Sequence, residues 1–132
     1  MGGPDLILLD THIWIWFNIS PDKLPNAVAR KFADGNQDFG ISAITLWETV
    51  LLAEKGRLET ALGPEDTARS WLKANPLPIF PVDSEVAFLT RSLRFVHADP
   101  ADRFIAATAF QLDVPLATVD PHLRKLGWLK VI

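Results

Sequence analysis

The sequence predicts an α/β sandwich around a mostly parallel central sheet, built as a single domain over residues 1–132. Predicted strands and helices alternate along the chain, as they do where helices cross over between parallel strands. The first predicted strand, residues 6–9, is an uninterrupted apolar run, which is typical of a strand buried on both faces. The 132 residues are 48% hydrophobic, enough to form the core of one domain.

The first half of the chain supplies the elements that follow this strand. We expect a helix, a turn, a second helix, a short strand and two further helices, at residues 11–17, 20–22, 25–33, 39–41, 42–55 and 64–73. Either Ser42 or Thr45 could cap the third helix, and Gly56 is its predicted stop. Gly63 and Pro64 open the fourth.

The second half of the chain continues the alternation. We expect a strand, two helices, a strand, a short helix and a last strand, at residues 79–82, 84–95, 100–112, 116–119, from 120 onward, and 128–131. Prolines border and interrupt the 79–82 segment, which favours an edge or strand-end position. Asp83 or Ser84 is the predicted cap of the helix that follows.

Composition excludes several classes of function. The formal net charge is −3, so no overall basic field attracts nucleic acid, and a phosphate partner would need a local basic patch or a bound metal. Cysteine is absent, which excludes disulfides, thiolate catalysis and cysteine-based zinc sites. The chain lacks a signal-peptide pattern and an apolar run of about 20 residues, so we expect a cytoplasmic protein without membrane segments.

Two aspartates directly follow predicted strands. Asp10 comes after residues 6–9, and Asp120 comes after residues 116–119. Ligands bind beyond the carboxyl ends of the strands in open α/β sheets, so both positions are typical of an active site. Aspartate is also a favoured helix N-cap, and Asp120 precedes Pro121, a preferred first helical residue. Each position alone therefore leaves cap and ligand open.

Glu48 lies within a predicted helix that has little polar surface. Its helical neighbours three and four positions away are mainly apolar: Ile44, Thr45, Leu51 and Leu52. A buried and unpaired carboxylate is costly in free energy, so such a group usually meets a cation or stays partly hydrated. The alternative is an exposed glutamate on the solvent side of the helix.

Asp102 repeats this pattern on the helix predicted from residue 100. Ile105, Ala106 and Ala109 share its face, and this stripe of apolar residues suggests close packing against the sheet. The alternative is an ordinary acid in the first helical turn, favoured by the helix dipole. Asp99 precedes Pro100 and is best explained as the N-cap.

The combination is harder to explain by capping than any one acid. Strand ends and the helix starts next to them meet at one edge of a doubly wound sheet, so we expect the four acids Asp10, Glu48, Asp102 and Asp120 to gather there. Gathered carboxylates repel one another and raise each other's pKa unless a cation neutralises them. Oxygen ligands suit Mg²⁺ or Mn²⁺, and such ions can activate water in phosphodiester cleavage.

Four segments of the sequence resemble the PIN-domain family, and more narrowly the VapC-like toxins of bacterial toxin–antitoxin pairs. They read LLDT, ISAITLWE, DRFIAATA and LATVD, at residues 8–11, 41–48, 102–109 and 116–120. Their order and spacing are similar to those of the family, over essentially the whole chain. The segment at residues 97–103 looks like the variant motif of one PIN subgroup. The resemblance implies a PIN-like three-layer α/β/α sandwich.

The same resemblance assigns roles and partners. It implies that Asp10, Glu48, Asp102 and Asp120 are catalytic metal ligands for Mg²⁺ or Mn²⁺, with Thr11 and Thr118 as polar supports and Asp99 as a supplementary or replacement ligand. It further implies a metal-dependent endoribonuclease that acts on an RNA substrate, forms a homodimer and is neutralised by a cognate antitoxin. We consider two alternatives: a catalytically inactive PIN-fold binding module, and a signalling domain in which Asp10 accepts phosphate.

Other residues have weaker signals. His12, His97 and His122 show no zinc-ligand spacing, and His97 has a structural or solvent role more often than a substrate contact. Arg103 should point away from the Asp102 face, where a salt bridge or surface contact is favoured over phosphate binding. The basic group near the C-terminus, Arg124, Lys125 and Lys130, is either solvated or in contact with RNA phosphate.

The first predicted helix is apolar nearly all round. Trp14, Ile15, Trp16 and Phe17 are consecutive, and a helix of this kind is either fully buried or partly covered by a partner. Because tryptophan is enriched at interfaces, we predict that part of this surface contributes to an antitoxin groove or a dimer interface. Core packing is the alternative.

Overall fold

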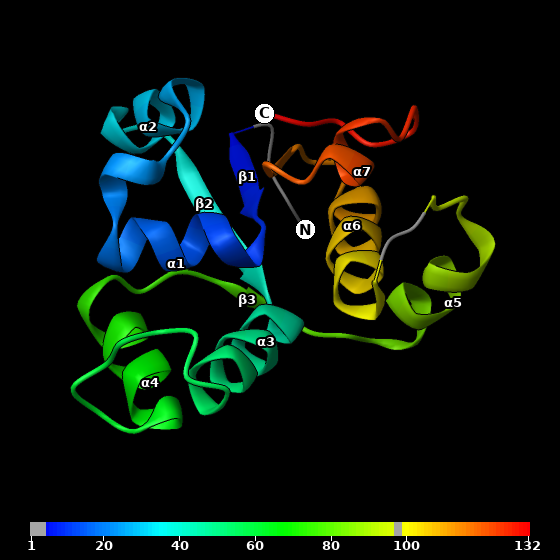
Figure 1. Cartoon of the computed structure of the whole chain (residues 1–132). Helices are drawn as coiled ribbons and strands as arrows, with labels where there is room; N and C mark the ends of the chain where they lie inside the picture. Colours follow the sequence, from blue (N-terminus) through cyan, green and yellow to red (C-terminus); the bar gives the residue numbers. More distant parts are fainter. Residues whose placement is uncertain (1–4, 97–98) are drawn as a thin grey trace.

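The computed structural model describes residues 5–96 and 99–132, and its centre is a parallel sheet (Figure 1). The strand order is β3-β2-β1-β4, and every pair is parallel. The strands are β1 (Leu6–Leu9), β2 (Asp38–Ser42), β3 (Ile79–Phe80) and β4 (Leu116–Ala117). The prediction of a parallel α/β sheet is confirmed, and the 79–82 segment forms an edge strand as its prolines indicated.

Helices cover both faces of this sheet, and Figure 1 shows α1 and α2 on one side with α6 and α7 on the other. The helices are α1 (Thr11–Ile19), the 3₁₀ turn η1 (Pro21–Lys23), α2 (Asn26–Ala33), α3 (Ala43–Glu54), α4 (Pro64–Ala74), α5 (Ser84–Ser92), α6 (Pro100–Leu112) and α7 (Pro121–Arg124). Helix α4 packs against α3, and α5 packs against α6. The three-layer α/β/α sandwich is thus as predicted.

The alternation of side chains along β1 creates two separate cores. Leu6 and Leu8 pack with residues of α6 and α7, whereas Ile7 and Leu9 pack with residues of α1 and α2. Successive side chains of a strand point to opposite faces, so one short apolar run anchors both helical layers. This packing fixes the carboxyl end of β1, and with it Asp10, between the two layers.

Several predicted boundaries differ from the structure. The strands expected at 79–82 and 116–119 shorten to Ile79–Phe80 and Leu116–Ala117, and the helix expected to reach Phe95 ends at Ser92. The prediction of a strand at 128–131 was wrong, because this segment forms only a single parallel bridge, between Val131 and Leu116. The indole of Trp128 is instead held by Phe95 and Phe110, with ring centroids 5.3 and 5.6 Å away, and by the carbonyl of Arg94.

The apolar first helix is mostly a core element. Trp14 and Ile15 are buried, whereas Trp16 and Phe17 are only half-buried. Phe17 stacks on Phe32, whereas Trp16 lines a surface hollow together with Ile15 and Ile19 of the same helix. Core packing therefore explains the apolar character of Trp14 and Ile15. Contact of the half-buried residues with an antitoxin or a second copy of the chain stays a prediction. Within the described residues, no helix is long and apolar enough to cross a bilayer.

Candidate functional site

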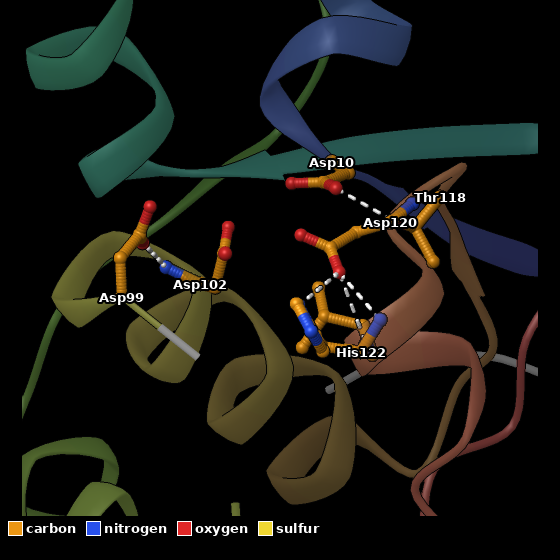
Figure 2. A network of polar contacts seen from close by, with 7 residues as sticks. Asp10, Asp99, Asp102, Thr118, Asp120 and His122 are labelled. Atoms are coloured by element: carbon orange, nitrogen blue, oxygen red, sulfur yellow. Dashed lines mark hydrogen bonds and ion pairs between the residues drawn. The ribbon is translucent and has the colours of Figure 1, made fainter. Parts of the chain in front are cut away.

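Three helices begin with an aspartate at the carboxyl edge of the sheet (Figure 2). Asp10 caps α1 through the amide of Thr11 (2.9 Å), and Asp99 caps α6 through the amide of Asp102 (2.9 Å). Asp120 caps α7 through the amides of His122 (2.7 Å) and Leu123 (3.3 Å). Each cap uses Oδ1 alone, and the partly positive helix N-termini favour the negative charges gathered there.

Asp10 is the most deeply placed of these acids, with 6% of its surface exposed. Its Oδ2 accepts a 2.6 Å hydrogen bond from the hydroxyl of Thr118, and its Oδ1 accepts the Thr11 amide. Burial raises the pKa of the Asp10 carboxyl, while the bonds from Thr118 and Thr11 oppose the rise. The side chain is therefore held rigidly with both oxygens engaged.

The hydroxyl of Thr118 joins two acids that are 110 positions apart. It donates to Asp10 and accepts the backbone N–H of Asp120 at 3.0 Å, so one buried hydroxyl sets the position of both. Thr118 itself is 1% exposed. Because a buried donor and a buried acceptor are satisfied together, this contact fixes the end of β4 against the end of β1.

Asp102 is half-buried in the first turn of α6 and faces the other acids (Figure 2). Burial raises the pKa of its carboxyl to about 8, and the negative charges of Asp10, Asp99, Asp120 and Glu48 act in the same direction. The four predicted ligands and Asp99 therefore share one electrostatic neighbourhood, as the sequence pattern suggested.

Glu48, on α3, is also half-buried. Burial raises the pKa of its carboxyl, the neighbouring Thr11 hydroxyl opposes the rise, and the charges of Asp99 and Asp10 add to it. The alternative of a fully exposed glutamate is excluded. Its apolar helical neighbours are themselves only partly buried, and the fully buried positions of α3 are Thr45 and Thr49.

The donor chemistry of this acidic cluster, defined as Asp10, Glu48, Asp99, Asp102 and Asp120, fits a hard divalent cation. The groups are carboxylates supported by threonine hydroxyls, the oxygen donors that Mg²⁺ and Mn²⁺ prefer. In the described ranges, Nδ1 of His122 lies 3.7 Å from Oδ1 of Asp120, and the pairs Arg69–Glu65 and Lys130–Asp113 lie outside the cluster. Burial raises the pKa of Asp10, Glu48 and Asp102, and a bound cation would favour their charged forms.

The cluster is an electrostatic neighbourhood and not a closed coordination shell. Within residues 5–96 and 99–132, no three acidic or histidine side chains are arranged to hold one ion together. In Figure 2 the carboxylates of Asp10, Asp102 and Asp120 face the same space from three different elements. Joint coordination therefore requires the half-buried side chains of Asp102 and Asp120 to turn toward Asp10, which its two hydrogen bonds hold in place.

Two neighbours of the cluster were not predicted from the sequence. The hydroxyl of Thr11 donates to that of Thr45 at 3.2 Å, so Thr45 positions the first turn of α1 against α3. His12 is close enough to Asp10 and Glu48 to act on both: burial raises their pKa values, and His12 opposes the rise. Its position two residues after Asp10 was the available signal.

Several of the remaining basic residues make structural contacts. Arg124 donates to the carbonyls of Thr118 (2.9 Å) and Ile132 (2.8 Å), so it ties the end of β4 to the last residue. Lys130 pairs with Asp113. Arg103 lies over the ring of Phe95, 5.1 Å from its centroid, consistent with the predicted surface contact. His97 lies outside the described residues.

Comparison with known proteins agrees with this architecture. The chain is similar to Ribonuclease VapC22 of Mycobacterium tuberculosis, with 31% identity over 121 residues and 89% of each sequence covered. A chain of VapBC2 from Rickettsia felis, crystallised with a promoter DNA fragment, matches in fold with a TM-score of 0.71 at 18% identity, over 96% of this chain and 97% of that one. FitAcB from Neisseria gonorrhoeae matches with a TM-score of 0.64 at 27% identity, over 96% of both chains.

The family model described as PIN domain matches residues 7–129, from β1 to the segment after α7. That range contains every member of the acidic cluster. The resemblance inferred from the four sequence motifs is confirmed, and the chain belongs to the PIN-domain family.

Proposed function

We propose that this protein is a divalent-metal-dependent endoribonuclease and the toxin of a type II toxin–antitoxin pair. The observation that carries the proposal is the acidic cluster, in which Asp102 has a pKa of about 8 beside four further carboxylates. The similarity to a protein named ribonuclease and to toxin–antitoxin complexes supports the choice of RNA and of an antitoxin partner. The proposal implies that the protein acts in the cytoplasm.

Asp10, Glu48, Asp102 and Asp120 would hold Mg²⁺ or Mn²⁺, with Asp99 as a supplementary ligand. When bound, the ion supplies a water of lowered pKa and stabilises negative charge on a phosphodiester. The protein's own contribution is positional. Thr118 fixes Asp10 and the backbone of Asp120, and Thr11 packs the start of α1 against α3.

The burial of each acid decides what it does in this scheme. Asp10 is sealed by its two hydrogen bonds and sets the geometry of the cluster. Glu48, Asp102 and Asp120 are half-buried, so they are the carboxylates that substrate and solvent can reach. The free Oδ2 of Asp120 faces Asp10 and Asp102 rather than its own helix (Figure 2). These groups can orient the attacking water and accept its proton.

Asp10→Asn tests the proposal. We expect purified protein to cut single-stranded or structured RNA with Mg²⁺ or Mn²⁺ and to lose this activity in EDTA. The variant should cut at least about 100-fold more slowly, the scale of losing one preorganised electrostatic contact at an active site. Its fold should persist, since asparagine keeps the size of the side chain and an oxygen for the Thr11 amide.

The matched control is Asp66→Asn, which makes the same change at an exposed position of α4. This control should cut RNA at the wild-type rate. Wild-type cleavage by the Asp10 variant would contradict the proposed site. Absence of Mn²⁺ binding in calorimetry of the wild-type protein would favour the inactive binding module.

A further inference from the structure

A surface hollow of about 510 Å³ lies between α1, η1 and the end of α3, next to the acidic cluster. We call it the α1–α3 hollow. Its volume is within the range of small-ligand sites. Ile15, Ile19, Leu52 and Leu58 give it an apolar floor, and Trp16 with His12 forms an aromatic wall, the two ring centroids 6.1 Å apart.

The hollow adjoins the acids through both helices. Leu52 is one turn, about 5.4 Å, beyond Glu48 on α3, and Trp16 is one turn beyond His12 on α1. His12, two residues after Asp10, is itself part of the lining, so the hollow begins beside the acid at the start of α1. A chain bound at the cluster can therefore continue directly into this hollow.

Two cations line the hollow, in a protein whose net charge is −3. They are Lys23 of η1 and Arg57 after α3, and both are exposed. Among the described residues, the ion pairs of the structure involve neither of them. Among the lining residues that the structure describes, Glu59 is the one acid, so the two cations outnumber it and the wall keeps a local positive charge.

The backbone of Arg57 is fixed by the way α3 ends. Gly56 adopts φ +73°, and its amide donates to the carbonyl of Ala53 at 3.0 Å. The amide of Arg57 then donates to the carbonyl of Leu52 at 2.9 Å. This pair of bonds is a Schellman motif, in which the left-handed residue reverses the chain over the helix end. The reversal directs residue 57 back to the wall of the hollow.

We propose that the α1–α3 hollow binds an unpaired nucleotide of the RNA substrate beside the scissile phosphate, with its base against Trp16 and its phosphates held by Lys23 and Arg57. The inference rests on the proposed ribonuclease function and names a subsite of it. Proteins bind single-stranded nucleic acids with this combination of aromatic side chains, on which bases stack, and cations, which contact phosphates. The exposed part of α1 was also predicted to meet a protein partner, but this combination favours RNA.

Binding can be measured separately from cleavage in the Asp10→Asn background. The probe is a fluorescein-labelled, single-stranded RNA 12-mer of mixed sequence, followed by anisotropy with Mn²⁺ between 50 and 200 mM KCl. Lys23→Gln with Arg57→Gln should raise Kd and lower the slope of log K against log salt by about 1.4, since each phosphate contact on a single strand contributes about 0.7. Lys73→Gln with Arg91→Gln is the charge-matched control at the exposed ends of α4 and α5, and should leave both values unchanged.

Trp16→Leu separates stacking from charge. It should weaken binding about 5-fold or more, the usual scale of one base–aromatic contact, while leaving the salt slope as it was. Thermal unfolding of each variant controls for loss of fold, and the Lys23 and Arg57 pair tests the inference even if the tryptophan variant is unstable. A salt slope equal to that of the control pair overturns the subsite, which is the result expected if a protein segment fills the hollow.

The two proposals fail in different ways. If wild-type protein cuts RNA and Asp10→Asn does not, but the Lys23 and Arg57 pair binds RNA like its control, the subsite alone is wrong. If wild-type protein neither cuts nor binds RNA with Mn²⁺, the ribonuclease function is wrong, and the subsite with it.

Discussion

At the scale of single residues, capping and membership of the acidic cluster are compatible roles. The sequence presented them as alternatives for Asp10 and Asp120, and it favoured a cap for Asp99. The structure gives all three residues a cap and a place in the cluster. A carboxylate has two oxygens, and a cap engages only one of them. Capping therefore holds the side chain while its charge still acts on the neighbours.

The sequence could predict which acids gather but not what holds them. Asp10, Glu48, Asp102 and Asp120 were identifiable because strand ends and helix starts meet at one edge of a parallel sheet. The contact between Thr11 and Thr45 depends on how α1 crosses α3, a distance in space that no local pattern encodes. The same holds for the placement of Lys23 and Arg57 at one hollow.

Thr118→Val should show how much one hydroxyl contributes. The change keeps the shape of the side chain but removes the donor to Asp10 and the acceptor of the Asp120 amide. We expect the free energy of unfolding to fall by about 2 kcal/mol, the range for a hydrogen bond to a charged group. RNA cleavage should fall as well, because Asp10 loses its orientation. Chemical denaturation and a cleavage assay measure the two effects.

Thr108→Val is the matched control for this change. Thr108 is equally buried at 1% exposure, but its hydroxyl donates to the Phe104 carbonyl within its own helix. This variant should keep full cleavage, whatever its stability. Equal cleavage by the two valine variants would show that Thr118 does not position the cluster.

At the scale of elements, existence was easier to predict than extent. The run of apolar residues in β1 identified the central strand because burial on both faces tolerates no polar side chain. The prediction of a strand at 128–131 was wrong because its apolar residues pack instead of pairing. Trp128 packs on Phe110 of α6, and Leu129 belongs to the core on that side of the sheet. An apolar segment of this length does not reveal whether it pairs or packs.

Helix α3 inverts the usual relation between polarity and burial. Thr45 and Thr49 are its fully buried side chains, whereas Trp47 is 56% exposed and, with Leu46, Val50 and Leu51, borders a hollow of about 340 Å³. An exposed tryptophan beside partly buried apolar side chains is typical of an interaction surface. We propose this face as the contact of the homodimer that the family resemblance implies.

Trp47→Ser tests this role of α3. If the homodimer forms through the α3 face, the variant should be monomeric at concentrations where the wild-type protein is dimeric, since a central tryptophan often contributes about 2 kcal/mol or more to an interface. Light scattering after size exclusion measures the mass. Leu62→Ser is the control, because Leu62 is similarly exposed (52%) but lies in the segment before α4. A dimeric Trp47 variant would place the interface elsewhere.

At the scale of the whole molecule, the parallel topology brings distant acids together. The strand order places β1 and β4 side by side, so the chain leaves both strands at the same edge, where α1 and α7 begin. Helix α6 packs against both β2 and α3, so the acids at the start of α6 and Glu48 of α3 act on one another. The folded state therefore concentrates negative charge that the unfolded chain keeps apart.

This concentration of charge makes the stability of the metal-free protein depend on pH. The folded-state pKa of Asp102 is about 8, above its ordinary value of 3.8, so between these values the folded protein binds more protons than the unfolded chain. The free energy of unfolding must therefore fall as pH rises from 5 to 8. The raised pKa values of Asp10 and Glu48 act in the same direction. Denaturation in EDTA at several pH values measures the trend.

Mn²⁺ should reverse this trend, because a cation binds the deprotonated carboxylates and offsets their repulsion. We expect the rise in Tm on adding Mn²⁺ to be larger at pH 8 than at pH 5.5, where protons compete for the same oxygens. Asp102→Asn should flatten the pH dependence in EDTA and reduce the effect of Mn²⁺, whereas Asp66→Asn should change neither. Two results would contradict this account of repelling carboxylates that bind a cation. One is a metal-free protein that becomes more stable from pH 5 to 8, and the other is an equal effect of Mn²⁺ on Tm at pH 5.5 and pH 8.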